Sequence, residues 1–443
     1  MNGAARGPVV TEWSDPRSAP ALLLRSFEAA VAAADPARVL ARHVPDEQTL
    51  RDYRRTVVVG AGKAAASMAA ALEQLWPSDC PLSGLVITRY GHALPCRRVE
   101  VVEAGHPVPD QSGQLAAQRL FEIAQDADPD DLLIVLLSGG GSSLLSLPVP
   151  EIPMADLRAV TQSLLASGTP IQSINVVRKH LSRVAGGRLA ASTRAQVLAL
   201  VISDVAGDDL SSIASGPCAP DPSTYGDALQ VIERHAVKAP GSVLAWLRRG
   251  AAGGVDETPK PGDAVFQRVE HRLIASAQRS LEAGAEVFRE AGIEAHILSD
   301  SMTGEARDVA EVHAAIARQI VRHGQPFARP VVLISGGECT VTVRGRGRGG
   351  RCSEFLLALA LAGADVPGLW ALAADTDGID GVEDDAGAWF GPDTLARLAR
   401  QGVDGRQMLA DNDAWQFFEA AGSLIRTGPT FTNVNDYRVL WIH

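Results

Sequence analysis

The chain has 443 residues, which is too long for one ordinary domain, so two or three domains are expected. Its hydrophobic content of 46% and charged content of 21% are typical of a folded globular protein and exclude a disordered or fibrous one. The net charge of -11 argues against non-specific binding to nucleic acid or to an anionic membrane surface. An anionic substrate would therefore have to be attracted by local positive charge.

The five cysteines are scattered without CxxC spacing, so they indicate neither a disulfide framework nor a zinc site. No apolar run approaches the roughly 20 residues that span a bilayer, and the first residues lack the pattern of a secretory signal. These features predict a cytoplasmic protein without a membrane partner.

Strands and helices alternate through the first half of the chain. After an N-terminal tail at residues 1–20, helical spacing predicts two helices in residues 21–40, broken at Asp35-Pro36. The alternation predicts a Rossmann-like doubly wound parallel sheet, in which ligands bind at the carboxyl ends of the strands. The expected strands are Thr56–Gly60, Gly84–Thr88, Val99–Ala104, Leu132–Leu137 and Gln196–Asp204, and the expected helices are Ser112–Ala124 and Ala155–Ser167.

The second half predicts another α/β domain. Glycine and proline mixed with short helical patterns indicate an inter-domain region at residues 246–268, between an N-terminal domain at 21–245 and a C-terminal domain at 269–443. The expected elements of the C-terminal domain are strands at His271–Ala275, Ala295–Leu298, Val331–Ile334, Val341–Val343, Leu369–Ala374 and Tyr437–Trp441, and helices at Gln278–Ala291 and Ala306–Arg322.

Two glycine-rich loops follow buried strands, SGGGSS at residues 138–143 and SGGE at residues 335–338. Glycines allow a tight turn and let an anion approach the backbone N–H groups at a helix start. In the simpler alternative, the glycines only make a sharp turn. The two loops predict two lobes that share an anionic ligand, with phosphate-binding candidates Ser138, Gly139, Gly140, Gly141, Ser142, Ser143, Gly336, Gly337 and Glu338.

A third turn, from Gly60 through Gly62 to Ala65, satisfies G-x-G-x-x-A between a strand and a helix. This minimal dinucleotide fingerprint makes an NAD(P)H-dependent enzyme an alternative. The next strand, however, ends in Arg89 where the fingerprint expects an acid. Lys63 opposes the helix dipole unless an anion lies there, so we predict that it binds phosphate or substrate; a solvated surface lysine is the alternative.

Carboxylates follow two further strands. Asp204 and Asp208 are candidates to hold Mg²⁺, and Asp204 could also accept a proton from a hydroxyl group. Asp377 is a third, tentative metal ligand, although aspartates are common in turns such as the one it occupies. No GxxxxGK[ST] and no paired kinase motifs occur, so a phosphotransferase would lie outside those large families.

Cationic side chains suited to an anionic substrate occur in two segments. Arg351 follows two glycines and precedes a helix, where a guanidinium can bind a carboxylate or phosphate with two parallel hydrogen bonds. Asn175 and Lys179, in INVVRKHLS, are further substrate-binding candidates, although a basic helix face is the commoner explanation for Lys179.

Taken together, GAGKAA, AGHPVPD, SGGGSSLL, INVVRKHLS, DVAGDDLSSIASGPCAPDPST, LSDSMTGEAR, SGGECTVTV, GGRCSE, DTDGIDG and TGPTFTNVNDYRVL resemble the glycerate 2-kinase family with a C-terminal MOFRL domain. The resemblance runs from about Leu22 to His443. It implies ATP-dependent phosphorylation of D-glycerate at the 2-hydroxyl with Mg²⁺, in a cleft between two α/β domains. It also implies catalytic roles for Lys63 and Arg351.

The sequence departs from the family pattern where Cys352 and Ser353 follow GGR and where Phe431 stands in PTFTN. These departures concern the identity of the 2-hydroxy acid more than phosphoryl transfer. Two other functions stay open: an NAD(P)H-dependent hydroxypyruvate reductase, a label that some relatives carry, and a non-catalytic sensor of a phosphorylated sugar acid. A homodimer is an assembly that the sequence allows.

Overall fold

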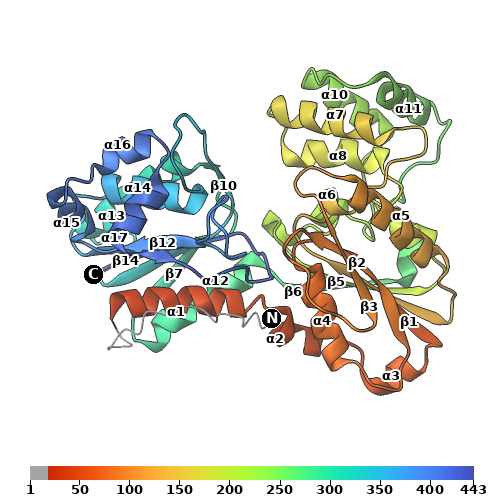
Figure 1. Cartoon of the computed structure of the whole chain (residues 1–443), viewed down its shortest axis with the longest axis horizontal. Coiled ribbons are helices and arrows are strands. Elements are labelled where there is room, and N and C mark those ends of the chain that lie inside the picture. Colours follow the sequence, from red (N-terminus) through yellow and green to blue (C-terminus); the bar gives the residue numbers. More distant parts are fainter. Residues whose placement is uncertain (1–17) are drawn as a thin grey trace, which may run out of the picture. The chain divides into compact units, whose positions relative to one another are not determined.

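The computed structural model describes residues 18–443, which form two compact units (Figure 1). The contiguous unit comprises residues 36–274, and the split unit combines residues 18–35 with residues 275–443. Of the tail expected at residues 1–20, residues 1–17 lie outside the described part of the chain. Within residues 18–443, no helix is long and apolar enough to cross a membrane.

A six-stranded sheet forms the centre of the contiguous unit, in the order β3-β2-β1-β4-β5-β6. The pairs from β3 to β5 are parallel, as the alternating pattern predicts. The register pairs Gly60 with Leu136 and Ala61 with Leu137, so the turns after β1 and β4 lie side by side. The strands are β1 (Arg55–Ala61), β2 (Leu82–Arg89), β3 (Val99–Ala104), β4 (Asp131–Leu137), β5 (Gln196–Ile202) and β6 (Val269–Ala275).

Helices cover this sheet and build a second apolar cluster. Val57 and Val59 of β1 share a buried core with Ala117 and Leu120 of α5, while α4 contacts β1, β2 and β4. A separate cluster joins α7, α8, α10 and α11 and buries Trp246. The helices are α2 (Pro36–Val39), α3 (Glu47–Arg51), α4 (Ala65–Leu75), α5 (Gln111–Gln125), α6 (Gly141–Leu144), α7 (Met154–Ala166), α8 (Ile171–Leu181), α9 (Arg188–Ser192), α10 (Tyr225–Arg234) and α11 (Gly241–Ala251).

The split unit is a mixed sheet between two helical layers, with strand order β13-β12-β11-β14-β9-β7. Within residues 18–443, β7 and β9 are parallel, and the other neighbouring strands of this sheet are antiparallel. Its strands are β7 (Glu294–Ser299), β9 (Val331–Ser335), β11 (Leu369–Asp375), β12 (Gly387–Phe390), β13 (Leu424–Ile425) and β14 (Asp436–Ile442), and β8 (Gly304–Glu305) pairs with β10 (Cys339–Thr340) outside the sheet.

Alternate residues of β9 and β14 face the two layers. Val332 and Val439 pack with α1 and α12, whereas Leu333 and Leu440 pack with α13 and α14. The helices are α1 (Ala19–Ala32), α12 (Ala277–Glu290), α13 (Ala306–His323), α14 (Arg351–Ala362), α15 (Thr394–Arg400), α16 (Gly405–Ala410) and α17 (Ala414–Ala421).

The structure divides the chain differently from the sequence-based expectation. Helix α1 packs against α12 in the split unit, although residues 21–35 were expected in the N-terminal domain. Strand β6 completes the first sheet instead of opening the second. The expected inter-domain region at 246–268 belongs to the contiguous unit, because α11 contributes to its second core. Val341–Val343, expected as a strand, is irregular.

Candidate functional site

Lys63 lies where the turns after β1 and β4 are tied together. Its backbone N–H donates to the carbonyl of Gly139 at 2.8 Å, and the next N–H, of Ala64, donates to Ser138 Oγ at 3.0 Å. Gly140, at positive φ, is close to both the Lys63 side chain and the His106 ring. The sheet register therefore brings Lys63, His106 and the SGGGSS loop to one edge of the sheet.

Gly60 and Gly62 have a structural explanation in this arrangement. A Cβ on Gly60 would lie 2.4 Å from the carbonyl oxygen of Leu136, and one on Gly62 would lie 2.1 Å from Ser138 Oγ. A Cβ on Gly141 would likewise lie 2.6 Å from the Cβ of Ala214. These glycines let the two turns pack against each other. The G-x-G-x-x-A pattern therefore needs no dinucleotide to account for it.

A chain of polar side chains extends the SGGGSS loop. Ser142 Oγ lies 2.8 Å from Ser215 Oγ, and Ser215 Oγ donates to Asn175 Oδ1 at 3.4 Å. Ala214 and Ser215 both have positive φ, of 50° and 60°. Such backbone strain costs roughly 1 kcal/mol or more per residue and concentrates at functional sites. Asn175, predicted as a substrate ligand, is thus placed next to the loop.

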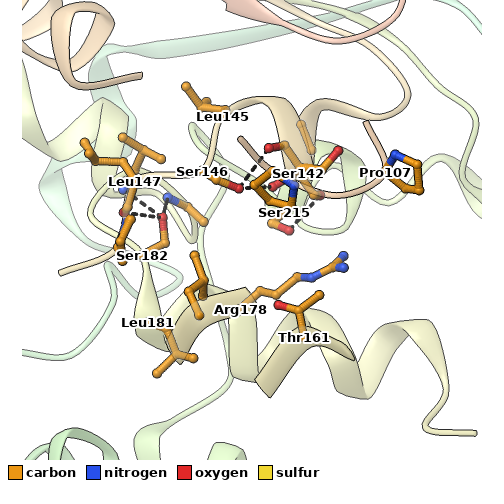
Figure 2. Close-up of a pocket in the computed structure, with 17 residues that line it drawn as sticks. Pro107, Ser142, Leu145, Ser146, Leu147, Thr161, Arg178, Leu181, Ser182 and Ser215 are labelled. Carbon is orange, nitrogen blue, oxygen red and sulfur yellow. Dashed lines mark hydrogen bonds between the residues drawn. The ribbon is translucent and has the colours of Figure 1, made fainter. Parts of the chain in front are cut away.

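Arg178 lines a pocket of about 40 Å³ together with Ser142 and Ser215 (Figure 2). This residue is not among the candidates predicted from the sequence. Arg178, Lys179 and His180 are consecutive, and the sequence does not show which of them the orientation of α8 turns toward the pocket. Lys179 is buried and pairs with the fully buried Asp221, with 3.4 Å between Nζ and Oδ1. This ion pair favours a structural role for Lys179 over the predicted contact with substrate.

Three acids follow β5, and they differ in their positions and contacts. Asp204 lies two residues after the buried end of that strand, so it is at the same sheet edge as the SGGGSS loop. Asp208, at φ 54°, occupies the short turn that follows. The neighbouring Asp209 accepts hydrogen bonds from Ser211 and Ser212, as in a local cap. Within residues 18–443, no group of three or more His, Cys, Asp or Glu residues is arranged to hold a metal ion by itself.

In the split unit, two buried aspartates fix Arg351 at the start of α14. The antiparallel register pairs Asp375, the last residue of β11, with Asp436, the first of β14. Arg351 Nη2 donates to Asp375 Oδ2 at 2.6 Å, and Nε donates to Asp436 Oδ1 at 2.7 Å. Nη1 faces the exposed Glu338, 3.3 Å from Oε1. Burial lowers the pKa of Arg351, but Asp436, Asp375 and Glu338 outweigh it and raise this pKa above its ordinary value.

A pocket of about 280 Å³ adjoins Arg351 and is lined by the glycines before α14 and by Asn412. The start of α14 is already capped, because Asp380 accepts the N–H groups of Cys352 and Ser353 at 2.9 and 2.8 Å. Arg351 lines this pocket, while Nη2 and Nε of its guanidinium are held by Asp375 and Asp436. The structure supports an anion contact by the side chain more than one by the helix start.

The second glycine loop is built differently from the first. The chain enters β10 after Gly337 instead of a helix, and a Cβ on Gly337 would lie 2.3 Å from the Met302 backbone. The buried Arg438 donates to the carbonyl of Gly336 at 3.0 Å. Asp377, the tentative metal ligand, accepts the N–H of Ile379 at 2.9 Å within its own turn. These contacts give local structural roles to residues that were predicted to bind phosphate or metal.

Comparisons with known proteins cover almost the whole chain. Residues 22–248 match the family described as a domain of unknown function (DUF4147), and residues 331–436 match the MOFRL family. A protein of Agrobacterium vitis, named provisionally as a hydroxypyruvate reductase, is 49% identical over 97% of this chain and 96% of its own. A glycerate 2-kinase of Pyrococcus horikoshii is 38% identical over 93% of this chain and 94% of its own.

The crystal structure of a glycerate kinase from Thermotoga maritima has the same fold, with a TM-score of 0.84. It is 37% identical in sequence, and the match covers 97% of this chain and 100% of that one. The sequence motifs, the two α/β units and relatives that match over almost their whole length all indicate the same family. The chain therefore belongs to the glycerate kinase family with a MOFRL region.

Proposed function

We propose that this protein is a glycerate 2-kinase, which transfers the terminal phosphoryl group of ATP to the 2-hydroxyl of D-glycerate and yields 2-phosphoglycerate and ADP. The relatives named glycerate 2-kinase, at 38% identity over most of the chain, support this assignment. The structural observation that carries it is the junction between Lys63 and the SGGGSS loop. There a cation, backbone amides and hydroxyl groups gather at the carboxyl edge of a parallel sheet, where such sheets bind ligands.

Lys63 supplies positive charge to the reacting groups in this proposal. Phosphoryl transfer depends mainly on in-line positioning and on neutralising charge on the phosphate oxygens. The Lys63 backbone is fixed by the bond to Gly139, so the position from which its side chain extends is set before substrate binds. The ammonium group then holds the transferring phosphoryl group or the 2-hydroxyl, and the SGGGSS loop contacts the ATP phosphates.

Arg351 binds the substrate carboxylate in this proposal. Asp375 and Asp436 hold its Nη2 and Nε, so the Nη1 edge is oriented without loss of side-chain freedom on binding. Glu338 competes for that edge, but its side chain is 57% exposed and can turn toward solvent when a carboxylate arrives. This arrangement makes Arg351 a pre-oriented donor.

Mg²⁺ is the metal that the proposed reaction uses, and Asp204 with Asp208 are the residues that would hold it. Mg²⁺ usually keeps several waters and binds one or two carboxylates together with substrate phosphates, so a site with two acids fits its chemistry. When bound, the ion neutralises phosphate charge. In this proposal Asp204, which follows β5 at the carboxyl edge of the sheet, also accepts the proton of the 2-hydroxyl.

A cytoplasmic location is proposed on separate grounds. All five cysteines lie within residues 18–443, and none of them forms a disulfide. Free buried thiols such as Cys218 and Cys352 are typical of a reducing compartment.

One assay separates the proposed activity from its rivals. The purified protein is incubated with D-glycerate, ATP and Mg²⁺, and 2-phosphoglycerate is detected by coupling to enolase; in parallel, NAD(P)H oxidation is followed with hydroxypyruvate. We expect turnover in the first assay and none in the second. NAD(P)H oxidation without a need for ATP would establish the reductase, and binding of glycerate or ATP without turnover would establish a sensor.

Two substitutions test the assigned cations. Lys63→Met and Arg351→Lys should each lower kcat/KM for D-glycerate at least about a hundredfold, because each removes roughly 3 kcal/mol of transition-state stabilisation. Lysine at position 351 keeps a charge beside the buried acids but loses the planar fork. The matched controls are Lys238→Met and Arg348→Lys, both at exposed positions. Near-normal rates in a folded Lys63→Met or Arg351→Lys variant would remove that assignment.

A further inference from the structure

Arg178 projects from α8 into the pocket beneath the SGGGSS loop. Figure 2 shows its side chain running between Thr161 and Ser215, with the guanidinium below Ser142. Leu147 and Leu181 contribute to the apolar wall on the other side of the same pocket. The pocket therefore combines one cation with several hydroxyl groups, including those of Ser142 and Ser215, in a lining that is otherwise largely apolar.

The charge of Arg178 is not compensated within residues 18–443. Within this part of the chain its guanidinium makes no hydrogen bond or ion pair, and burial lowers the pKa of Arg178 with no opposing effect from a nearby acid. Its neighbours on α8 differ: Lys179 pairs with Asp221, and His180 contacts Glu257 at 3.3 Å. A half-buried guanidinium without a partner costs solvation free energy, which a bound anion would restore.

The shape of the pocket limits the size of that anion. A volume of about 40 Å³ is roughly that of three water molecules, since one water needs about 10–15 Å³ on the same measure. This space suits a single carboxylate or phosphate group but not a nucleoside. Ser142 Oγ and Ser215 Oγ lie 2.8 Å apart, and each hydroxyl has one hydrogen to donate. Ser142 can turn its hydrogen from Ser215 to such a group, and Ser215 can do the same by releasing Asn175 Oδ1, which it contacts at 3.4 Å.

We propose that Arg178, Ser142 and Ser215 form an oxyanion subsite that binds one anionic group of the reactants. As a part of the reaction, this subsite rests on the proposed function. The proposed function assigns the substrate carboxylate to Arg351, which leaves a phosphate of the nucleotide as the group for this subsite. The carboxylate of the 2-hydroxy acid is the competing source, because both groups offer the oxygen pair that a guanidinium binds with two parallel hydrogen bonds, and kinetic measurements distinguish them.

Anion binding is tested first, without any turnover. The melting temperature of the full chain is measured with no anion, with inorganic phosphate and with D-glycerate, for the wild type, Arg178→Met and the exposed control Arg249→Met. We expect at least one anion to raise the melting temperature of the wild type and the control by a few degrees, but not that of Arg178→Met. Without anion, Arg178→Met should be at least as stable as the wild type, whereas loss of a purely structural arginine would lower stability. Equal stabilisation of wild type and Arg178→Met, or none in the wild type, would overturn the subsite.

Kinetics then identify the group that is bound. A rise of at least about tenfold in KM for D-glycerate in Arg178→Met assigns the carboxylate, and a similar rise in KM for ATP assigns a phosphate; Arg178→Lys should recover part of either loss. Unchanged KM and kcat for both reactants would contradict the proposal. If the wild type has no glycerate kinase activity, the proposed function fails, while the melting experiment still decides whether the subsite binds an oxyanion.

Discussion

Asp385 is a buried carboxylate whose two oxygens have no hydrogen-bond partner within residues 18–443. Burial, and next the charge of Asp380, raise its pKa to about 7. The folded state therefore favours the protonated form, and stability is lost as the pH rises from the ordinary aspartate pKa near 4 toward 7. The loss is at most about 1.4 kcal/mol per pH unit.

Replacing this carboxylate by an amide should therefore stabilise the protein at high pH. We expect Asp385→Asn to raise the melting temperature at pH 8 and to give a smaller gain at pH 5, where more of the wild-type carboxylate is protonated. The control is Asp384→Asn, whose side chain is 70% exposed and pairs with Arg426. A gain that is the same at both pH values would show that ionisation of Asp385 is not its cause.

The contribution of His313 to stability depends on pH in the opposite direction. Its Nδ1–H donates to the Val309 carbonyl at 2.7 Å and its Nε2 accepts from Ser335 Oγ at 3.0 Å, so the neutral ring satisfies both contacts. Burial lowers its pKa to about 4. The unfolded chain thus takes up the proton first, and stability should be lost as the pH falls from about 6.5 to 4.

Urea unfolding at several pH values measures this loss. His313→Asn should lower stability at pH 7 but flatten the decline between pH 6.5 and 4.5, whereas the exposed control His323→Asn should keep the wild-type slope. A variant at position 313 with an unchanged slope would place the acid sensitivity elsewhere.

At the level of elements, the junction of β1 and β4 depends on glycine at position 62. A Cβ there would lie 2.1 Å from Ser138 Oγ and 2.6 Å from the Ser138 carbonyl oxygen, at φ +144°. We expect Gly62→Ala to lower the free energy of unfolding by about 2–4 kcal/mol, through strain and displacement of the loop. Gly253→Ala, also at positive φ but with open space around it, should cost only about 1 kcal/mol. Equal costs in urea titrations would contradict the packing argument.

Local patterns predicted these elements well, because a strand such as β4, buried along its whole length, is apolar throughout. Local patterns do not show which strands pair when they are far apart in the sequence. The sequence does not show that β6 joins the first sheet, or that Asp375 and Asp436 meet across two antiparallel strands to hold Arg351. Periodicity also marks α8 as basic without showing which of its three cations faces a pocket.

The whole chain is connected in a way that composition cannot reveal. Helix α1 shows an apolar face, but nothing in that face indicates that it covers the sheet formed by the last strands of the chain. Phe27, which is 1% exposed, lies in one buried cluster with Phe288 and Tyr437, and its ring centroid is 6.1 Å from that of Tyr437. The split unit therefore includes residues from both ends of the described chain.

This connection predicts which strands are destabilised by a substitution in the core face of α1. Phe27→Ala leaves a cavity in that cluster and should destabilise the split unit by about 3–5 kcal/mol. Hydrogen exchange measured by mass spectrometry should then be faster in β9 and β14, whose residues share the cluster, and unchanged in β4 of the contiguous unit. Glu28→Ala, on the exposed face of α1, should leave all three strands unchanged. Faster exchange in β4 alone would contradict the assignment of α1 to the split unit, because the cavity would then weaken the core of the other sheet.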